Sequence, residues 1–418
     1  MTNDIDRVEP NNRDKTFSRR DVLKGTLAAG AGALAISALG GRFLAQTAEA
    51  AGGMNLHAGA VYAMTNQMTG NAVVAFYRAP DGGLTLAGTF ATGGRGSGGF
   101  DQSQNALVLS GRPGADRALE SNQLLFVVNP GSNDVSVLAV GDNGLTLVSR
   151  APSGGSRPTS VTVHDDLLYV LNAGALPAGM GGDANISGFT LSPKGELSPL
   201  PGSTRPLSGN PAAGAAQVQF DPKGGLLLVT ERNANIIDTY RVDQQTGLAG
   251  PPMPNANSGV APFGFAFTDR GAAGQVIVAQ GFQAGPGQGG ATSYIVTDEG
   301  SLQTVSPDVR DGQDDTCWVV ITNDKQYAYV ANFFSDNVSS YSVGSDGALI
   351  LLDTEAGRVD PGGRANDEAL SIDSRFLYVR NFTTGNISAF LVNTDGSLSP
   401  LPGANALSPA MGYGLAAR

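Results

Sequence analysis

The fold is decided by two stretches near the C-terminus, YAYVANFFSDNVSSYSV (Tyr327–Val343) and FLYVRNFTTGNISAFLV (Phe376–Val392). Each begins with a β-rich run that ends in Asn, turns through Ser, Asp, Gly or Asn, and continues as a second run with alternating side chains. Runs of this kind, interrupted by turn residues, are typical of antiparallel β-hairpins. The two stretches therefore predict a hairpin unit that the chain repeats.

Five weaker copies precede these two in the chain, and they are VYAMTN (Val61–Asn66), LLFVVNPGSNDVSVLAV (Leu124–Val140), LLYVLNAG (Leu167–Gly174), LLLVTERNANIIDTYRV (Leu226–Val242) and QVIVAQ (Gln275–Gln280). A turn such as Asp346-Gly347 leads from a hairpin into a third strand, and a short run such as PTSVTV (Pro158–Val163) precedes the next unit. Units that start roughly 40 to 65 residues apart fall in the range of propeller blades. We expect an all-β protein, a seven-bladed β-propeller of four-stranded antiparallel blades.

The two ends of the repeated region predict how the ring closes. The region begins with the second strand of a blade, and the last residues, SPAMGYGLAAR (Ser408–Arg418), have the spacing of the strand that precedes a unit. A linear solenoid would need polar capping repeats, and the sequence shows none at either end. We therefore expect residues 51–418 to form a single propeller whose C-terminal strand completes the first blade.

Composition agrees with this class and excludes others. The chain has 58 Gly and 23 Pro among 418 residues, and only 15% of its residues are charged, which argues against helix-rich and coiled-coil proteins. The formal net charge is −11, and no Lys/Arg cluster occurs beyond the N-terminal tail, so we expect no nucleic-acid partner. The single cysteine, Cys317, rules out an intramolecular disulfide.

Residues 1–50 have the pattern of an export signal. Ser18-Arg19-Arg20 is followed by a Gly/Ala/Leu-rich stretch and by Ala48-Glu49-Ala50, which fits a twin-arginine signal with cleavage after Ala50. The alternative is an uncleaved membrane anchor, but the stretch is short and only mildly apolar for a bilayer span. We expect recognition by the twin-arginine export machinery, a periplasmic or secreted mature protein, and no membrane association after cleavage.

The Y-V-x-N runs, followed by a Ser/Asn turn and a V-S-x-Y/F strand, resemble the YVTN-repeat, lactonase-type β-propellers. That group includes bacterial 6-phosphogluconolactonase and fungal carboxymuconate cyclase. The resemblance covers about residues 57–418. It implies a small-molecule substrate, a lactone or a related carboxylated ring compound, that is hydrolysed or isomerised in the axial cleft.

One position of the repeat stands out among the seven copies, which are Asn66, Asn129, Asn172, Glu231, Gln280, Asn332 and Asn381. The six amides suit a role in stabilising the turn that follows each strand. Glu231 is the only carboxylate in the set, and perturbed carboxylates often mark functional sites. The resemblance implies that Glu231 is the acid/base or substrate-orienting group of the cleft.

The other candidate residues lie on the rim that Glu231 is expected to share. They are Arg232, Arg157 and Arg364, which could bind a substrate carboxylate, together with Gln217, Gln280 and Asn332. The family often places a His in an earlier blade and a P-R-H-like run before the Glu blade. Here those places hold Arg157-Pro158-Thr159-Ser160 and Gly214-Ala215-Ala216-Gln217, and the only histidines are His57 and His164. A histidine general base is therefore not expected.

Two acidic pairs, Asp314-Asp315 and Asp367-Glu368, precede inner strands of successive blades in this interpretation. They could be solvated loop acids, or with Glu231 they could bind a divalent cation. Oxygen-only ligands favour Ca²⁺ or Mg²⁺ over zinc. Convergence of Glu231, Asp315 and Glu368 would favour metal-assisted catalysis, and separation would favour the alternative function, a non-catalytic binding or interaction propeller in the periplasm.

Overall fold

The computed structural model describes residues 55–99, 103–110, 123–174, 184–210, 213–270, 274–281, 285–404 and 412–418. All of them belong to one compact unit that spans Thr47–Arg418. The predicted export signal, residues 1–50, lies outside the described residues. Among the described residues, no helix is long and apolar enough to cross a membrane.

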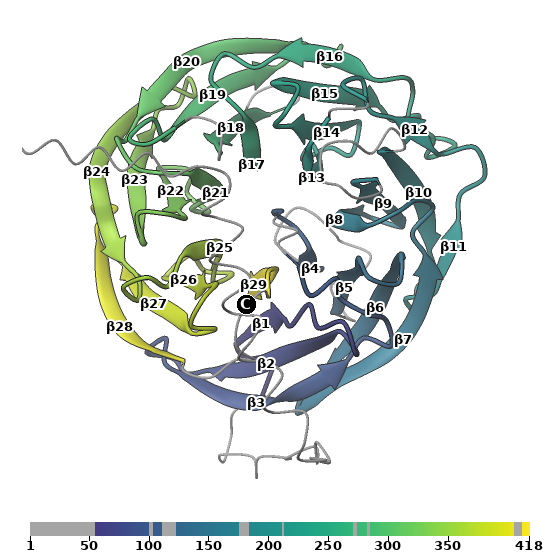
Figure 1. The fold of residues 1–418 in the computed structure, drawn as a ribbon, viewed down its shortest axis with the longest axis horizontal. Helices are drawn as coiled ribbons and strands as arrows, with labels where there is room; N and C mark the ends of the chain where they lie inside the picture. The colour runs from purple at the N-terminus through teal and green to yellow at the C-terminus, as the bar shows by residue number, and fades with distance from the viewer. Residues whose placement is uncertain are drawn as a thin grey trace, which may run out of the picture. The chain divides into compact units, whose positions relative to one another are not determined.

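The described strands form seven antiparallel sheets arranged as blades around one axis (Figure 1). The first four blades consist of β29 (Leu415–Ala417), β1 (Ala60–Met64), β2 (Ala72–Arg78) and β3 (Leu84–Ala91); β4 (Leu107–Leu109), β5 (Leu124–Asn129), β6 (Asp134–Gly141) and β7 (Gly144–Pro152); β8 (Pro158–His164), β9 (Leu167–Asn172), β10 (Asn185–Leu191), β11 (Leu197–Pro199) and β12 (Arg205–Pro206); and β13 (Ala215–Phe220), β14 (Leu226–Glu231), β15 (Ile236–Arg241) and β16 (Met253–Ala256).

Blades 5 to 7 follow in chain order and consist of β17 (Pro262–Thr268), β18 (Gln275–Gln280), β19 (Gly290–Val296) and β20 (Leu302–Arg310); β21 (Thr316–Ile321), β22 (Tyr327–Asn332), β23 (Asn337–Val343) and β24 (Leu349–Arg358); and β25 (Ala365–Leu370), β26 (Phe376–Asn381), β27 (Ile387–Val392) and β28 (Leu398–Ala404). The seven-bladed fold predicted from the repeats is confirmed. In blade 3 the outer strand is split into β11 and β12, which both pair with β10.

Ring closure occurs as predicted, because β29 pairs with β1 and makes the last strand of the chain the inner strand of blade 1. The Arg418 amide and carbonyl bond with Ala60, and Arg78 Nε donates to the Arg418 carbonyl at 2.7 Å. Figure 1 shows the yellow C-terminal strand beside the purple first strands. The two ends of the described chain are thus held in one sheet.

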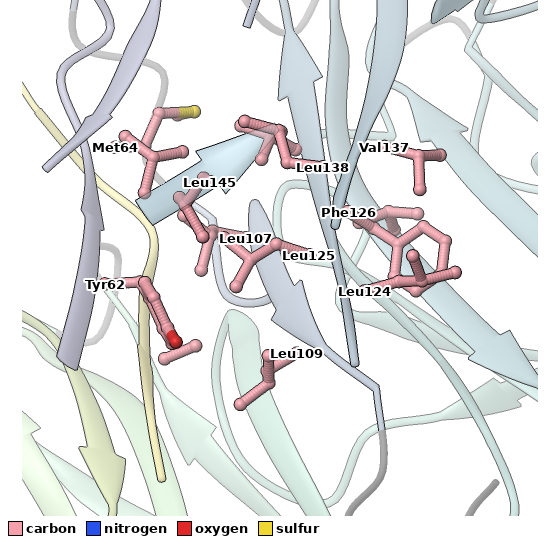
Figure 2. Close-up of a cluster of buried hydrophobic side chains, with 14 of the residues drawn as sticks. Tyr62, Met64, Leu107, Leu109, Leu124, Leu125, Phe126, Val137, Leu138 and Leu145 are labelled. Carbon is pink, nitrogen blue, oxygen red and sulfur yellow. The ribbon is translucent and has the colours of Figure 1, made fainter. Parts of the chain in front are cut away.

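The core fills the spaces between neighbouring blades. Second strands such as β5, β14 and β18 are buried on both faces, which explains why their sequences are continuous apolar runs rather than alternating ones. Figure 2 shows one such cluster, in which Tyr62 and Met64 of β1 lie near Leu107 of β4 and Leu125 of β5. The outer strands are largely exposed or half-buried instead, as in β24, where Ile350 is exposed.

A short segment before β4 links two blades that are not neighbours. Gln104 Nε2 donates to the Val319 carbonyl at 2.8 Å, and the Val319 amide donates to Gln104 Oε1 at 3.1 Å. Trp318 Nε1 donates to the Ser103 carbonyl at 3.2 Å. A Cβ on Gly264 would lie 2.1 Å from Gln104 Oε1, so glycine makes room for this crossing from blade 2 to blade 6.

Candidate functional site

We call the upper rim the side on which inner strands begin and second strands end. A positive φ recurs there at the residue before an inner strand, as in Arg157 (56°), Asp315 (60°) and Arg364 (63°). The carbonyl of each of these residues accepts a bond from the residue that follows the second strand, for example Phe333 N with Asp315 O at 2.9 Å. Because the arrangement recurs in several blades, this left-handed backbone belongs to the architecture and is not strain confined to one site.

Glu231 ends β14 on the upper rim and is completely buried. Its carboxylate accepts hydrogen bonds from the Gly209 amide at 2.9 Å and from Ser208 Oγ at 3.3 Å. Ser208 also donates to Asp238 of β15, at 2.9 Å from its amide and 2.5 Å from its hydroxyl. Burial and, secondarily, the neighbouring Asp238 together raise the pKa of Glu231 to about 8.

The same repeat position makes a similar contact in other blades. Asn129 Nδ2 donates to Ser136 Oγ at 2.8 Å, and Asn332 Nδ2 donates to Ser339 Oγ at 2.8 Å. Asp238 occupies in blade 4 the place of these serines, seven residues after the repeat position. The amides therefore connect the second and third strands within a blade, and Glu231–Asp238 replaces an amide–hydroxyl pair by two carboxyl groups.

A second group on the upper rim brings together three of the predicted residues. Asp315 is 5% exposed, its Oδ1 accepts the Cys317 thiol at 2.8 Å, and its Oδ2 has no hydrogen-bond partner among the described residues. The pKa of Asp315 is about 6, because burial raises it by more than the Cys317 thiol and the charges of Arg232 and Arg364 lower it. Blades 4, 6 and 7 thus each supply one charged member of this group.

Aromatic rings lie beneath the two arginines. Arg364 Cζ is 4.7 Å from the ring centroid of Phe334, and Arg232 Cζ is 5.8 Å from that of Phe263. Trp318 lies between the rings near Arg232 and those near Arg364. Its ring centroid is 5.4 Å from that of Phe263 and 6.2 Å from that of Phe333. A guanidinium over an aromatic face is held by cation–π attraction and still presents its N–H donors at the edge of its plane. We refer to Arg232, Asp315 and Arg364 with these rings as the Arg/Asp/aromatic group.

The other predicted ligand-binding residues make contacts within the protein. Arg157 donates to the carbonyls of Gly174 and Ala173, at 3.0 and 3.2 Å. Gln217 exchanges two hydrogen bonds with the backbone of Phe265, and Gln280 Nε2 donates to Asp308 at 2.9 Å. Gln217, Gln280 and Asn332 are fully buried. Substrate contacts by these residues stay predictions.

The acidic pairs occupy different surroundings. Asp314 Oδ1 accepts the Gly287 amide. Asp367 and Glu368 were expected to precede an inner strand, but they lie within β25, because that strand begins at Ala365 directly after the left-handed Arg364. Both line a cavity on the propeller axis, whereas Glu231 and Asp315 do not line it.

Metal ligands do not gather in the part of the chain that the structure describes, where no three His, Cys, Asp or Glu side chains are grouped to hold an ion. The hydrogen-bond and charge neighbours of Glu231, Asp315 and Glu368 are different sets of residues. His57 lies 4.0 Å from Asp142, and His164 lies 3.6 Å from Asp165 at the end of β8 away from the upper rim. Neither histidine belongs to the Arg/Asp/aromatic group.

The sequence reasoning missed the aromatic members and the thiol contact of this group. A signal was present one residue after the repeat amide, where blades 4, 6 and 7 carry Arg232, Phe333 and Phe382 and blades 3 and 5 carry Ala173 and Gly281. Phe382 lies 5.7 Å from Phe333, centroid to centroid. Blades 1 and 2 have Gln67 and Pro130 at this position, so its charged and aromatic side chains belong to blades 4, 6 and 7.

The fold is that of a seven-bladed β-propeller, and it is structurally similar to proteins of the 6-phosphogluconolactonase and lactonase type. A periplasmic gluconolactonase from Pseudomonas aeruginosa superimposes with a TM-score of 0.62 at 16% identity, over 85% of this chain and 98% of that one. A provisionally assigned 6-phosphogluconolactonase from Bacteroides uniformis gives a TM-score of 0.64 at 15% identity, over 86% and 99%. No protein-family model and no curated protein matches the sequence. At these identities the likeness establishes the fold.

Proposed function

We propose that the protein hydrolyses a small lactone, or a related carboxylated ring compound, at the Arg/Asp/aromatic group. The observation that carries the proposal is Asp315, a buried carboxyl with one unpartnered oxygen whose pKa is affected by two arginines from different blades. The lactonases among the similar structures support the reaction class. Arg364 and Arg232 would bind the anionic group of the substrate, since a guanidinium suits a planar carboxylate.

Asp315 would act as the general base. A pKa of about 6 leaves Asp315 mostly ionised at neutral pH and still able to accept a proton. In this step water attacks the carbonyl carbon of the lactone and transfers a proton to Asp315. The ring C–O bond then breaks, the proton passes to the leaving oxygen, and the product is an open hydroxy acid.

The test is a pH-stat assay of the purified protein with a panel of carboxylated and uncharged lactones. We expect D315N to lower kcat by about 10²- to 10⁴-fold, the usual contribution of general acid–base catalysis. R364Q should raise KM for the carboxylated lactone about 10-fold or more, because a charge-assisted hydrogen bond contributes about 1.5–3 kcal/mol. The control R358Q changes an exposed arginine on β24 and should leave both constants unchanged.

The same assay separates the alternatives. The role of Glu231 as acid/base group stays a prediction, and loss of turnover in E231Q with full activity in D315N would favour it. Binding of the carboxylated compounds without turnover by the wild-type protein would indicate a non-catalytic binding propeller. Absence of both binding and turnover across the panel would refute the proposed substrate class.

Export by the twin-arginine pathway is part of the proposal, and it rests on residues 1–50 of the sequence. Replacing Arg19 and Arg20 by lysine should retain the protein in the cytoplasm and leave its presequence uncleaved. Cell fractionation with an immunoblot measures both effects. Periplasmic accumulation of the double variant at the wild-type level would contradict this route.

A further inference from the structure

A cavity of about 460 Å³ lies along the propeller axis, apart from the Arg/Asp/aromatic group. It reaches the lower rim, defined as the turns between inner and second strands, where Asp269 and Asn323 are exposed. Its other end is lined by Gln104, the residue that crosses from blade 2 to blade 6. Small-molecule sites usually have volumes of about 300 to 1,000 Å³, so the cavity is large enough to hold one.

The accessible walls of the cavity are largely apolar. Val108 of β4, Ala266 of β17 and Ile321 of β21 line it, and each is half-buried. These residues come from blades 2, 5 and 6, so apolar surface faces the axis from several directions. A ligand with an apolar body would cover this surface, and burial of apolar surface is favourable.

One polar side chain meets the cavity with a defined orientation. Gln219 lines the cavity and is half-buried, between the buried Val218 and Phe220 of the same strand, β13. Its Oε1 accepts the Nε2 of Gln217 at 3.0 Å. Gln217 is itself fixed by the backbone of Phe265, since it donates to the carbonyl at 2.9 Å and accepts the amide at 2.6 Å. Because these bonds assign the oxygen of Gln219 to Gln217, they leave the NH₂ group of Gln219 to donate to an acceptor in the cavity.

Accessible charge in the described part of the wall lies near the lower rim. Deeper in the cavity, Asp367 and Glu368 are 2% and 3% exposed, so they present almost no surface to a ligand. Burial raises the pKa of Asp367 to about 8 and that of Glu368 well above its ordinary value, so neither favours a cation at neutral pH. At the lower rim Lys223 is exposed, and Lys325 Nζ lies 3.8 Å from Asp269. The interior therefore suits an uncharged molecule.

We propose that the axial cavity binds a small neutral carbonyl compound, such as a ketone or an amide. Its oxygen accepts a hydrogen bond from the NH₂ group of Gln219, and its apolar body lies against Val108, Ala266 and Ile321. An ammonium ion would place its own donors opposite this NH₂ group. A purely apolar molecule would leave the NH₂ group without an acceptor, which costs binding free energy. The site is separate from the Arg/Asp/aromatic group, so the proposal does not depend on lactone hydrolysis.

A ligand-observed NMR titration of the full chain tests the proposal, with cyclohexyl methyl ketone as probe. Its counterpart is 1-cyclohexylethylammonium, which has the same carbon skeleton and an ammonium group in place of the carbonyl oxygen. We expect saturable binding of one ketone per chain and binding of the ammonium ion that is weaker by about tenfold or more. Q219M keeps the length of the side chain but removes the donor, and it should weaken ketone binding by about tenfold. The matched control Q303M, on the exposed face of β20, should leave ketone binding unchanged.

A second variant covers the case in which Q219M does not fold. A266F places a ring in the cavity from the neighbouring blade and leaves Gln219 unchanged, so it should also weaken ketone binding by about tenfold or more. Equal or tighter binding of the ammonium ion would overturn the proposal, as would unchanged ketone affinity in a folded Q219M or A266F. Weaker ketone binding in R364Q would place the ketone at the Arg/Asp/aromatic group and would overturn the proposal as well.

Discussion

Replacing Glu231 by Gln should stabilise the protein and reduce the pH dependence of its stability. In the folded protein burial raises the pKa of Glu231 from 4.5 to about 8, with Asp238 adding to the effect. Between these two values the unfolded chain has lost the proton that the folded chain retains. Stability is therefore fully present below pH 4.5, decreases as the pH rises, and reaches its lower limit above pH 8.

The size of the effect follows from the span of pH. Each pH unit in this range costs about 1.4 kcal/mol, so at pH 7 the wild-type protein has lost roughly 3 kcal/mol at this group. Glutamine cannot ionise, and its oxygen can still accept the Gly209 amide while its NH₂ donates toward Asp238. This restores the type of contact that Asn332 makes with Ser339 in blade 6. We expect E231Q to gain about 2–3 kcal/mol at pH 7 and nothing at pH 4.5.

The assay is urea unfolding at pH values from 5 to 9, followed by the fluorescence of Trp318, the only tryptophan. The control is the reverse substitution in blade 6, N332D. It places a carboxyl at the position equivalent to Glu231 and removes the amide that donates to Asn337 and Ser339. N332D should lose stability, and the loss should grow with pH. If E231Q keeps the wild-type pH dependence, or is the less stable protein at pH 8, the proton that Glu231 retains in the folded protein is not the cause.

Three further predictions concern stability. Q104A removes both bonds to the Val319 backbone and leaves a buried amide and carbonyl unsatisfied, so it should cost roughly 2–3 kcal/mol in urea unfolding, whereas unchanged stability would show that the crossing is dispensable. Deleting residues 414–418 removes β29 from blade 1 and should lower Tm by more than about 10 °C in calorimetry. The reason is that burial of Leu415 alone contributes roughly 2 kcal/mol, and the hydrogen bonds between β29 and β1 are lost as well. An unchanged Tm would refute closure of the ring by this strand. Y240F removes the hydroxyl that contacts Asp238 and the Pro206 carbonyl, each at 3.1 Å, and should cost about 1 kcal/mol, again measured by urea unfolding.

The repeats predicted the fold because the information is local. Runs such as Leu124–Asn129 and Phe376–Asn381 are apolar throughout since both faces of a second strand are covered by neighbouring blades. The inner strands were harder to recognise. The inner strand of blade 2 is the three-residue β4. In blade 7 the inner strand β25 contains Asp367 and Glu368, two acidic residues that are typical of loops rather than of buried strands.

The site was less accessible to sequence reasoning because its members come from distant blades. Arg232 and Arg364 were chosen for their charge and for their place on the rim, and the structure brings both near Asp315. Cys317 is buried in an apolar cluster, and its thiol also donates to Asp315, a contact that follows the bulge at the start of β21. Nothing in a single sequence indicates that bulge.

Two kinds of departure from the repeat can now be distinguished by their surroundings. At the amide position, Glu231 differs from the other copies, but the partner position has changed with it, so the pair Glu231–Asp238 forms an internally satisfied contact with Ser208. At the next position, blades 3 and 5 have the small residues Ala173 and Gly281, whereas Arg232 and Phe382 are only partly enclosed and Phe333 is buried against Phe382. A substitution that is compensated within its own blade is explained by stability, whereas one that leaves charge and aromatic surface at the rim requires another cause. This reasoning favours the Arg/Asp/aromatic group over Glu231 as the place where a ligand binds.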